Sequence, residues 1–170
     1  ARDVSEVEAF HGFAAAFGQY VRGGKVIVGR DTRPSGQMIE HAVTAALVAI
    51  GCQPVIAGII PTPTVQLLVN KLRANGGIVI SASHNPEAWN ALKFIGPSGS
   101  FLNHAEAEEL LDIYNQPDSG WIPEQDMRKP IRLNHPFEHH LNRVLAAVNS
   151  DAIRKAAFRV AIHPRSEDRR

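Results

Sequence analysis

Two polar segments of the chain carry the side chains that group-transfer chemistry needs. The first places two guanidinium groups and a carboxylate within four residues, at Arg30, Asp31 and Arg33. The second places a hydroxyl group beside an imidazole, at Ser83 and His84. If the fold brings these segments together, the result is a serine nucleophile surrounded by positive charge.

Such an arrangement suits phosphoryl transfer. The transition state of that reaction is usually loose, and its negative charge is spread over the equatorial phosphoryl oxygens. Proteins stabilise this charge with Arg, Lys and backbone amides, and a serine can carry the phosphoryl group covalently between two transfers. Asn85, held by Pro86, and Lys93 add further polar groups. A neighbouring Ser and His also occur together by chance, in loops where the serine simply caps nearby amides.

The segments that flank these loops predict the elements that position them. Short β-branched runs indicate strands, and apolar residues at helical spacing indicate helices. The expected strands are 25–29, 54–60, 78–80 and 92–95, and the expected helices are 7–21, 37–50, 64–73 and 103–115. Because strands and helices alternate, we expect a three-layer α/β/α domain with a mixed, mostly parallel sheet of about four strands. The fourth strand follows the third without a helix, which favours antiparallel pairing.

Both polar segments directly follow a predicted strand. In open α/β sheets, ligands bind at the carboxyl ends of the strands, so we expect the two segments to meet there. Beyond them the pattern changes: residues 116–135 are rich in Pro, Gly and charged residues, which indicates a connector. A further helix is predicted over 136–148, and a further strand over 158–162 as the start of a second domain.

The bulk composition excludes some functions. The chain has 170 residues, of which 44% are hydrophobic, enough for a packed core. The formal net charge is +1, so no strong field favours nucleic acid or an anionic membrane. No apolar run reaches the roughly 20 residues that span a bilayer. The single cysteine, Cys52, excludes an internal disulfide and is typical of a reducing compartment, so we expect a cytoplasmic protein.

Five strings of the chain follow one another in the order and spacing of one enzyme family. They are Val-Gly-Arg-Asp-Thr-Arg-Pro-Ser-Gly at 28–36, Pro-Thr-Pro at 61–63, Gly-Gly-Ile-Val-Ile at 76–80, Ser-Ala-Ser-His-Asn-Pro at 81–86 and Asn-Ala-Leu-Lys at 90–93. They resemble segments of the α-D-phosphohexomutases, the family of phosphoglucomutases and phosphomannomutases. In that family the serine before His-Asn-Pro is phosphorylated. The resemblance covers about residues 7 to 115 and is highly specific.

The resemblance implies a role for each matching residue. Ser83 would carry the phosphoryl group, and its phosphate would help to bind Mg²⁺. Lys93 would be the general acid/base or electrostatic partner, and His84 would lie near the transferring group. The residues that would support the phosphate and the serine loop are Arg30, Arg33, Asn85 and Asn90.

The resemblance also implies a reaction and its partners. Phosphate would move reversibly between O1 and O6 of a hexose phosphate, through a hexose 1,6-bisphosphate that also serves as activator. The protein would thus be an isomerase and intramolecular phosphotransferase of carbohydrate metabolism. Its partners would be a small hexose phosphate and the remaining domains of a longer parent chain, with neither nucleic acid nor membrane.

The chain departs from the family pattern in two ways. Ala91 stands where the family usually has Gly, and a positive φ there would strain it by roughly 1 kcal/mol. The family's N-terminal Gly-x-Arg-Gly loop, its Asp-Gly-Asp-Gly-Asp-Arg metal loop and its sugar-recognition loops are missing. We therefore expect a fragment that is inactive alone: domain I at 1–115, a connector at 116–135, and a linking helix with the truncated start of domain II at 136–170. The hexose and the oligomeric state stay open.

Two other functions compete with the mutase. One is a binding module that kept the anion-binding loops but lost turnover, which Ala91 and the missing acidic loop favour. The other is a hydrolase that uses Ser83 without phosphate, although no Gly-x-Ser-x-Gly elbow is present.

Three other features invite functional interpretations. The run Glu138-His139-His140 lacks the spacing that places two metal-binding imidazoles on one helical face, so we expect a solvated surface. Cys52 lies among apolar residues, which favours a packed thiol over a nucleophile. Trp89 either walls the pocket or merely packs beside the serine loop.

Overall fold

The predicted α/β domain is present, with element ends shifted by a few residues. The computed structural model describes residues 4–86, 88–116 and 120–161. The elements in chain order are α1 Val4–Tyr20, β1 Gly24–Arg30, α2 Gly36–Ala49, β2 Cys52–Ile59, α3 Thr62–Lys71, β3 Gly76–Ile80, β4 Leu92–Ile95, α4 His104–Tyr114, the 3₁₀ turn η1 Glu124–Asp126, β5 Ile131–Arg132, α5 Glu138–Ala146 and α6 Ser150–Ala156.

The strands form one mixed sheet in the order β4-β3-β1-β2-β5. β1 lies at its centre and pairs in parallel with β2 on one side and β3 on the other. β4 pairs antiparallel with β3, as expected for a strand that returns without a helical crossover. The predicted topology of the first four strands is therefore confirmed.

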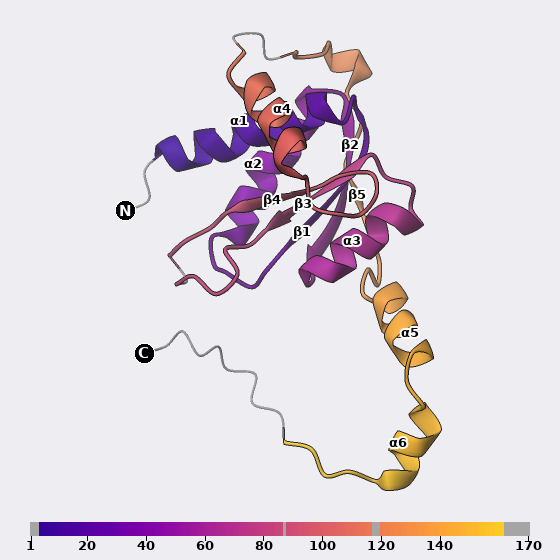
Figure 1. Cartoon of the computed structure of the whole chain (residues 1–170). Helices are drawn as coiled ribbons and strands as arrows, with labels where there is room; N and C mark the ends of the chain where they lie inside the picture. Colours follow the sequence, from indigo (N-terminus) through magenta and orange to yellow (C-terminus); the bar gives the residue numbers. More distant parts are fainter. Residues whose placement is uncertain (1–3, 87, 117–119, 162–170) are drawn as a thin grey trace.

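Helices cover both faces of the sheet (Figure 1). Alternate residues of β1 point to opposite faces, so Val26 and Val28 join the core under α1, α2 and α4, while Ile27 joins the core under α3. Each core has its own fully buried anchors, such as Phe17 on the first side and Val65 on the second. The result is the predicted three-layer α/β/α architecture.

Gly29 lets α3 lie close to the central strand. A Cβ at this position would come within 2.7 Å of Val65 Cγ2 and 2.9 Å of Ile60 Cγ1. No real side chain tolerates such distances, so a larger residue would push α3 off the sheet. The glycine of the Gly-Arg-Asp string is thus explained by packing.

The sheet has five strands rather than about four. The missed strand, β5, has only two residues and lies within the charged segment predicted as a connector, so its sequence carries no alternation to detect. It pairs in parallel with Val55 and Ile56 of β2. The connector therefore contributes an edge strand to the sheet.

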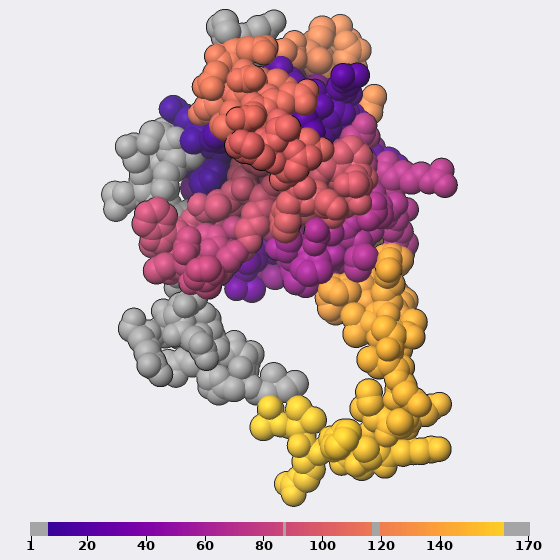
Figure 2. Space-filling model, viewed as in Figure 1, coloured from indigo at the N-terminus to yellow at the C-terminus, as the bar shows by residue number. Residues whose placement is uncertain are grey.

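The C-terminal prediction was correct in part. The helix predicted over 136–148 is present as α5, but α6 was not predicted. The strand predicted over 158–162 is wrong for residues 158–161, and residue 162 lies outside the described residues. A strand needs a pairing partner, and Phe158 and Val160 are 70% and 74% exposed. Figure 2 shows this part of the chain standing away from the main body. No helix in the described ranges combines the length and apolar character needed to cross a membrane.

Cys52 is a buried thiol, as the sequence predicted. Its S–H donates to the Gly18 carbonyl oxygen at 3.7 Å. Burial raises the thiol pKa from 9.0 to about 11, although the charge of Arg128 acts to lower it.

We expect Cys52 to be alkylated by iodoacetamide at pH 8 about a hundredfold more slowly in the folded chain than in urea, because only the thiolate reacts. Mass spectrometry of timed aliquots measures both rates, and equal rates would contradict the buried placement. Because the folded pKa lies above the ordinary value of 9.0, the neutral thiol contributes its full stability below pH 9. That contribution is lost as the pH rises toward 11.

Candidate active site

The two polar loops meet at the point where the order of the strands in the sheet reverses. From β1 the chain crosses through α2 to β2 on one side, and then returns through α3 to β3 on the other. The loops that leave β1 and β3 therefore start side by side at the carboxyl edge, where ligands bind in open α/β sheets. A hydrogen bond from the Asp31 amide to the Ile80 carbonyl oxygen, at 3.0 Å, joins the two loops at their base.

The loop after β3 presents Ser83 in an unusual backbone conformation. Its φ is +55°, in the left-handed region that non-glycine residues rarely adopt. Two local hydrogen bonds hold it: the Ser83 amide donates to Ser81 Oγ at 3.2 Å, and the Asn85 amide donates to the Ala82 carbonyl oxygen at 3.0 Å. Backbone strain of this kind persists only where the surroundings fix the conformation, and it is typical of functional loops. Ser83 itself is exposed, so its hydroxyl group is accessible.

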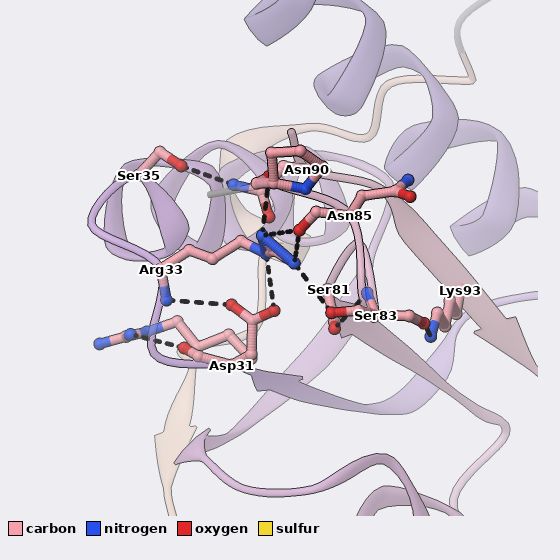
Figure 3. A network of polar contacts seen from close by, with 10 residues as sticks. Asp31, Arg33, Ser35, Ser81, Ser83, Asn85, Asn90 and Lys93 are labelled. Carbon is pink, nitrogen blue, oxygen red and sulfur yellow. Dashed lines mark hydrogen bonds and ion pairs between the residues drawn. The ribbon is translucent and has the colours of Figure 1, made fainter. Parts of the chain in front are cut away.

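Arg33 joins the two loops through its guanidinium group (Figure 3). Its Nη1 donates to the carbonyl oxygens of Asn85 and Pro86, both at 3.2 Å. Its Nη2 donates to the carbonyl oxygens of Ser83 and Asn85, both at 3.0 Å. On the opposite side, Asp31 Oδ2 accepts from Arg33 Nε at 2.9 Å, and Asp31 Oδ1 accepts from the Arg33 amide at 3.0 Å. Arg33 thus clamps the serine loop by three of its backbone carbonyl groups.

Lys93 brings a positive charge to the serine hydroxyl group. The antiparallel return of β4 beside β3 places it next to the serine loop, and its Nζ donates a hydrogen bond to Ser83 Oγ. Figure 3 shows the two side chains pointing toward one another. An ammonium group in this position stabilises negative charge on Oγ when a bond to that oxygen forms or breaks.

The other predicted site residues lie around this pair in different ways. His84 is exposed, and no described hydrogen bond joins its ring to the other site residues. Asn85 contributes its backbone carbonyl to Arg33, as described above. Asn90 Nδ2 donates to Ser35 Oγ at 2.5 Å, which ties the far end of the serine loop to the start of α2.

No described hydrogen bond or ion pair joins the Arg30 side chain to the serine loop. Its Nη1 donates to the Asp31 carbonyl oxygen at 3.2 Å, and its Nε lies 3.3 Å from Glu40 Oε2. Any support that it gives to the loop therefore passes through Asp31. The sequence reasoning missed Glu40, although a carboxylate in register with the buried Gly36 and Val43 of α2 was a detectable signal.

Ala91 adopts no strained conformation. The described non-glycine residues with positive φ are Arg22, Arg73, Ser83, His135 and Ala157. Ala91 is not among them, so the expected strain of a Gly-to-Ala replacement is absent. Its carbonyl oxygen accepts from the Ser81 amide at 2.9 Å, which closes the base of the serine loop.

The histidine run after the connector forms no metal site within the described residues. No three His, Cys, Asp or Glu side chains come together there in a metal-binding arrangement. His140 instead shares a hydrogen bond of 2.7 Å between its Nδ1 and Thr64 Oγ1, which attaches α5 to the first turn of α3. The solvated surface expected for this run is present only in part, since Glu138 is exposed whereas His139 and His140 are half-buried.

Comparison with known proteins gives the family. The family model for the phosphoglucomutase/phosphomannomutase alpha/beta/alpha domain I matches residues 5–120 of this chain. The chain belongs to the phosphoglucomutase/phosphomannomutase family. The matched range contains the whole serine loop, both arginines and Lys93.

Members of this family with curated names resemble the chain over part of their length. A phosphoglucosamine mutase from Sulfurovum sp. (strain NBC37-1) is 41% identical over 103 residues, which are 61% of this chain and 23% of that protein. A phosphoglucosamine mutase from Helicobacter pylori (strain Shi470) is 32% identical over 159 residues, 85% of this chain and 36% of that protein. The chain thus spans about a quarter to a third of the relatives that it matches.

A solved structure of the family shares the fold. The structure of a putative phosphomannomutase from Thermus thermophilus superposes with a TM-score of 0.72 at 26% identity, over 85% of this chain and 32% of that chain. The α/β/α architecture described above is therefore that of a phosphoglucomutase/phosphomannomutase domain.

The clamp of Arg33 gives a prediction about the family's basic loop. Lysine keeps the charge but cannot reach three carbonyl oxygens with a planar fork. We therefore expect Arg33→Lys to lower the free energy of unfolding by about 1–2 kcal/mol. Urea titration followed by circular dichroism measures this difference. Arg128→Lys, on the exposed connector, is the matched control, and an equal effect of both substitutions would refute the clamp.

Proposed function

We propose that this chain is the phosphoserine domain of a hexose-phosphate mutase, with Ser83 as the phosphoryl carrier. The observation that carries this proposal is the hydrogen bond from Lys93 Nζ to the exposed Ser83 Oγ. The nucleophilic oxygen of Ser83, on the loop that Arg33 fixes, is thereby paired with the positive charge of Lys93. Membership of the family supports the same function.

The pair suits both directions of transfer. When phosphoserine donates, the Oγ–P bond breaks and a P–O bond to a sugar hydroxyl group forms. Lys93 then stabilises or protonates the departing Oγ, which gains the proton that the sugar hydroxyl group loses. In the reverse step Oγ attacks a phosphorus atom of the bisphosphate and loses its proton, the P–O bond to the sugar breaks, and the sugar oxygen gains that proton. One serine exchanges phosphate with both O1 and O6 of the hexose. The bisphosphate must therefore reorient in the site between the two steps, and the net result is a shift of phosphate between O1 and O6.

The relatives suggest which sugar to test first. The curated relatives described above are named phosphoglucosamine mutases, whereas the solved structure is titled a putative phosphomannomutase. We therefore propose an amino-sugar phosphate as the first substrate to assay, with glucose and mannose phosphates beside it. A cytoplasmic location remains a prediction from the single cysteine.

Mg²⁺ and hexose 1,6-bisphosphate are proposed as cofactor and activator from the family resemblance. The described residues alone do not fit a magnesium site, since they hold no cluster of three metal-binding side chains and Asp31 is engaged by Arg33. The ligand that this chain would add is the phosphate on Ser83.

The division into domain I at 1–115, a connector at 116–135 and a linking segment at 136–170 also stays a proposal, as does the inactivity of this chain alone. An exposed carrier serine supports the second point, because phosphoryl transfer needs a site that excludes water. The binding-module alternative has lost one of its two supports, since Ala91 is unstrained.

Peptide mass mapping tests the proposal. The full-length parent protein is incubated with a hexose 1,6-bisphosphate and magnesium, digested and mapped. One phosphate on the peptide that contains Ser83 is the expected result. A folded protein with an unmodified Ser83 would instead favour the binding module, and labelling of Ser83 by a fluorophosphonate would favour the hydrolase.

A further inference from the structure

A buried carboxylate lies between two arginines from different elements. Glu40 of α2 is 3% exposed. Its Oε2 lies 3.3 Å from Arg30 Nε at the end of β1, and its Oε1 lies 3.6 Å from Arg132 Nη2 of β5. A buried charge is costly unless it is paired. A carboxylate that faces two cations is therefore a built feature of this edge of the sheet.

Arg132 reaches Glu40 across a break in the sheet. The register of β1 and β2 shifts between Val28 and Gly29, where Gly58 of β2 has φ +69°. A Cβ on Gly58 would lie 3.9 Å from Arg132 Nη1, so the guanidinium group passes directly over the glycine. The Arg132 side chain thus packs beside the bulge where it approaches Glu40.

A series of ion pairs and hydrogen bonds leads from Glu40 to the serine loop. Glu40 Oε2 forms an ion pair with Arg30 Nε without a hydrogen bond of good geometry, and Arg30 Nη1 donates to the Asp31 carbonyl oxygen at 3.2 Å. The carboxylate of Asp31 holds Arg33, whose guanidinium group holds the carbonyl oxygens of the serine loop, including that of Ser83. Each link is a direct contact between named atoms, from Arg132 of β5 to the backbone carbonyl oxygen of Ser83.

We propose that Glu40 is a positioning residue for the serine loop, and that through Arg132 it couples the connector strand β5 to that loop. Glu40 touches no reacting atom and acts by fixing Arg30 against Asp31. The connector leads from this domain to the rest of the chain. A shift of β5 would therefore change the position of the serine loop that carries Ser83. The effect on loop position is independent of the chemistry, whereas its consequence for turnover rests on the proposed function.

Residue-resolved amide exchange, measured by NMR on the 170-residue chain, tests this proposal. We expect Glu40→Gln, which keeps size and removes charge, to speed exchange of the Ser83 and Asn85 amides about tenfold. Arg132→Gln, at an exposed side chain, should speed the same amides by about threefold. Amides in the middle of β1 and β3 should exchange as in the unchanged protein. The matched control is Arg128→Gln, which removes the same charge four residues earlier on the connector.

The outcomes separate the two parts of the proposal. If the Glu40→Gln protein folds and its Ser83 and Asn85 amides exchange at unchanged rates, the proposed role of Glu40 is overturned. If that variant does not fold, Arg132→Gln decides, and exchange equal to that of Arg128→Gln would overturn the coupling. A non-multiplicative effect in the double variant would support a shared route. Failure of the proposed function is seen elsewhere, as an unphosphorylated Ser83 in the parent protein while the exchange effects persist.

Discussion

On the proposed function, Ser83→Ala in the full-length protein should lower mutase turnover by at least about a thousandfold, because it removes the oxygen that would carry the phosphoryl group. Folding should survive, since the Ser83 side chain is exposed and its only described side-chain partner is Lys93. A coupled assay of hexose-phosphate interconversion measures the rate, and thermal melting measures the fold.

A matched serine separates this effect from a general loss of hydroxyl groups. Ser98 lies on another exposed turn, where its Oγ accepts from the Ser100 amide at 3.3 Å. Ser98→Ala should therefore leave turnover within about twofold of the unchanged enzyme. Near-normal turnover of Ser83→Ala would remove Ser83 as carrier and leave the binding module as the better account.

The strands that position the site were predictable because their chemistry is local. The run Val26 to Val28 is β-branched and buried on both faces, and the turn at Gly23 and Gly24 adopts positive φ at both glycines. The capping box that opens α4 is equally local, because the Asn103 and Glu106 side chains each accept a hydrogen bond from the other's amide. In each case a few adjacent residues determine the structure, so the sequence alone is sufficient.

The partners within the site were not predictable in the same way. The sequence placed Arg30 and Arg33 together, yet only Arg33 contacts the serine loop while Arg30 turns toward Glu40. Arg30 is the last residue of β1 and its side chain meets Glu40 of α2, whereas Arg33 lies three residues further along, in the loop. The positive φ of Ser83 was likewise invisible, because serine has no marked preference for that conformation.

The edge strand β5 shows a third limit of local reasoning. Its two residues, Ile131 and Arg132, join the sheet by pairing with β2 and by the ion pair of Arg132 with Glu40. Both contacts are with residues far earlier in the chain. A composition rich in Pro and charged residues predicts a connector, but it could not show that this segment pairs with β2 and contacts Glu40.

Lys93→Met in the full-length parent enzyme is expected to lower kcat by about a hundredfold to ten-thousandfold, the usual contribution of a positioned acid or base. Methionine keeps the length of the side chain but removes the ammonium group that donates to Ser83 Oγ. Because the interaction strengthens as charge develops on Oγ, the loss should fall on kcat, while KM changes little. Steady-state kinetics measures both values.

The matched control for this substitution lies at the opposite end of the sheet. Lys25 is exposed near the amino end of β1, far along the strand from the serine loop, so Lys25→Met should leave kcat unchanged. Lys93→Met should also melt like the unchanged protein, since an exposed hydrogen bond contributes little to stability. A normal kcat in Lys93→Met would exclude Lys93 from the chemistry and make its contact with Ser83 a feature of the resting loop alone. A loss of kcat with unchanged melting would place the ammonium group in the transition state, as the proposed mechanism requires.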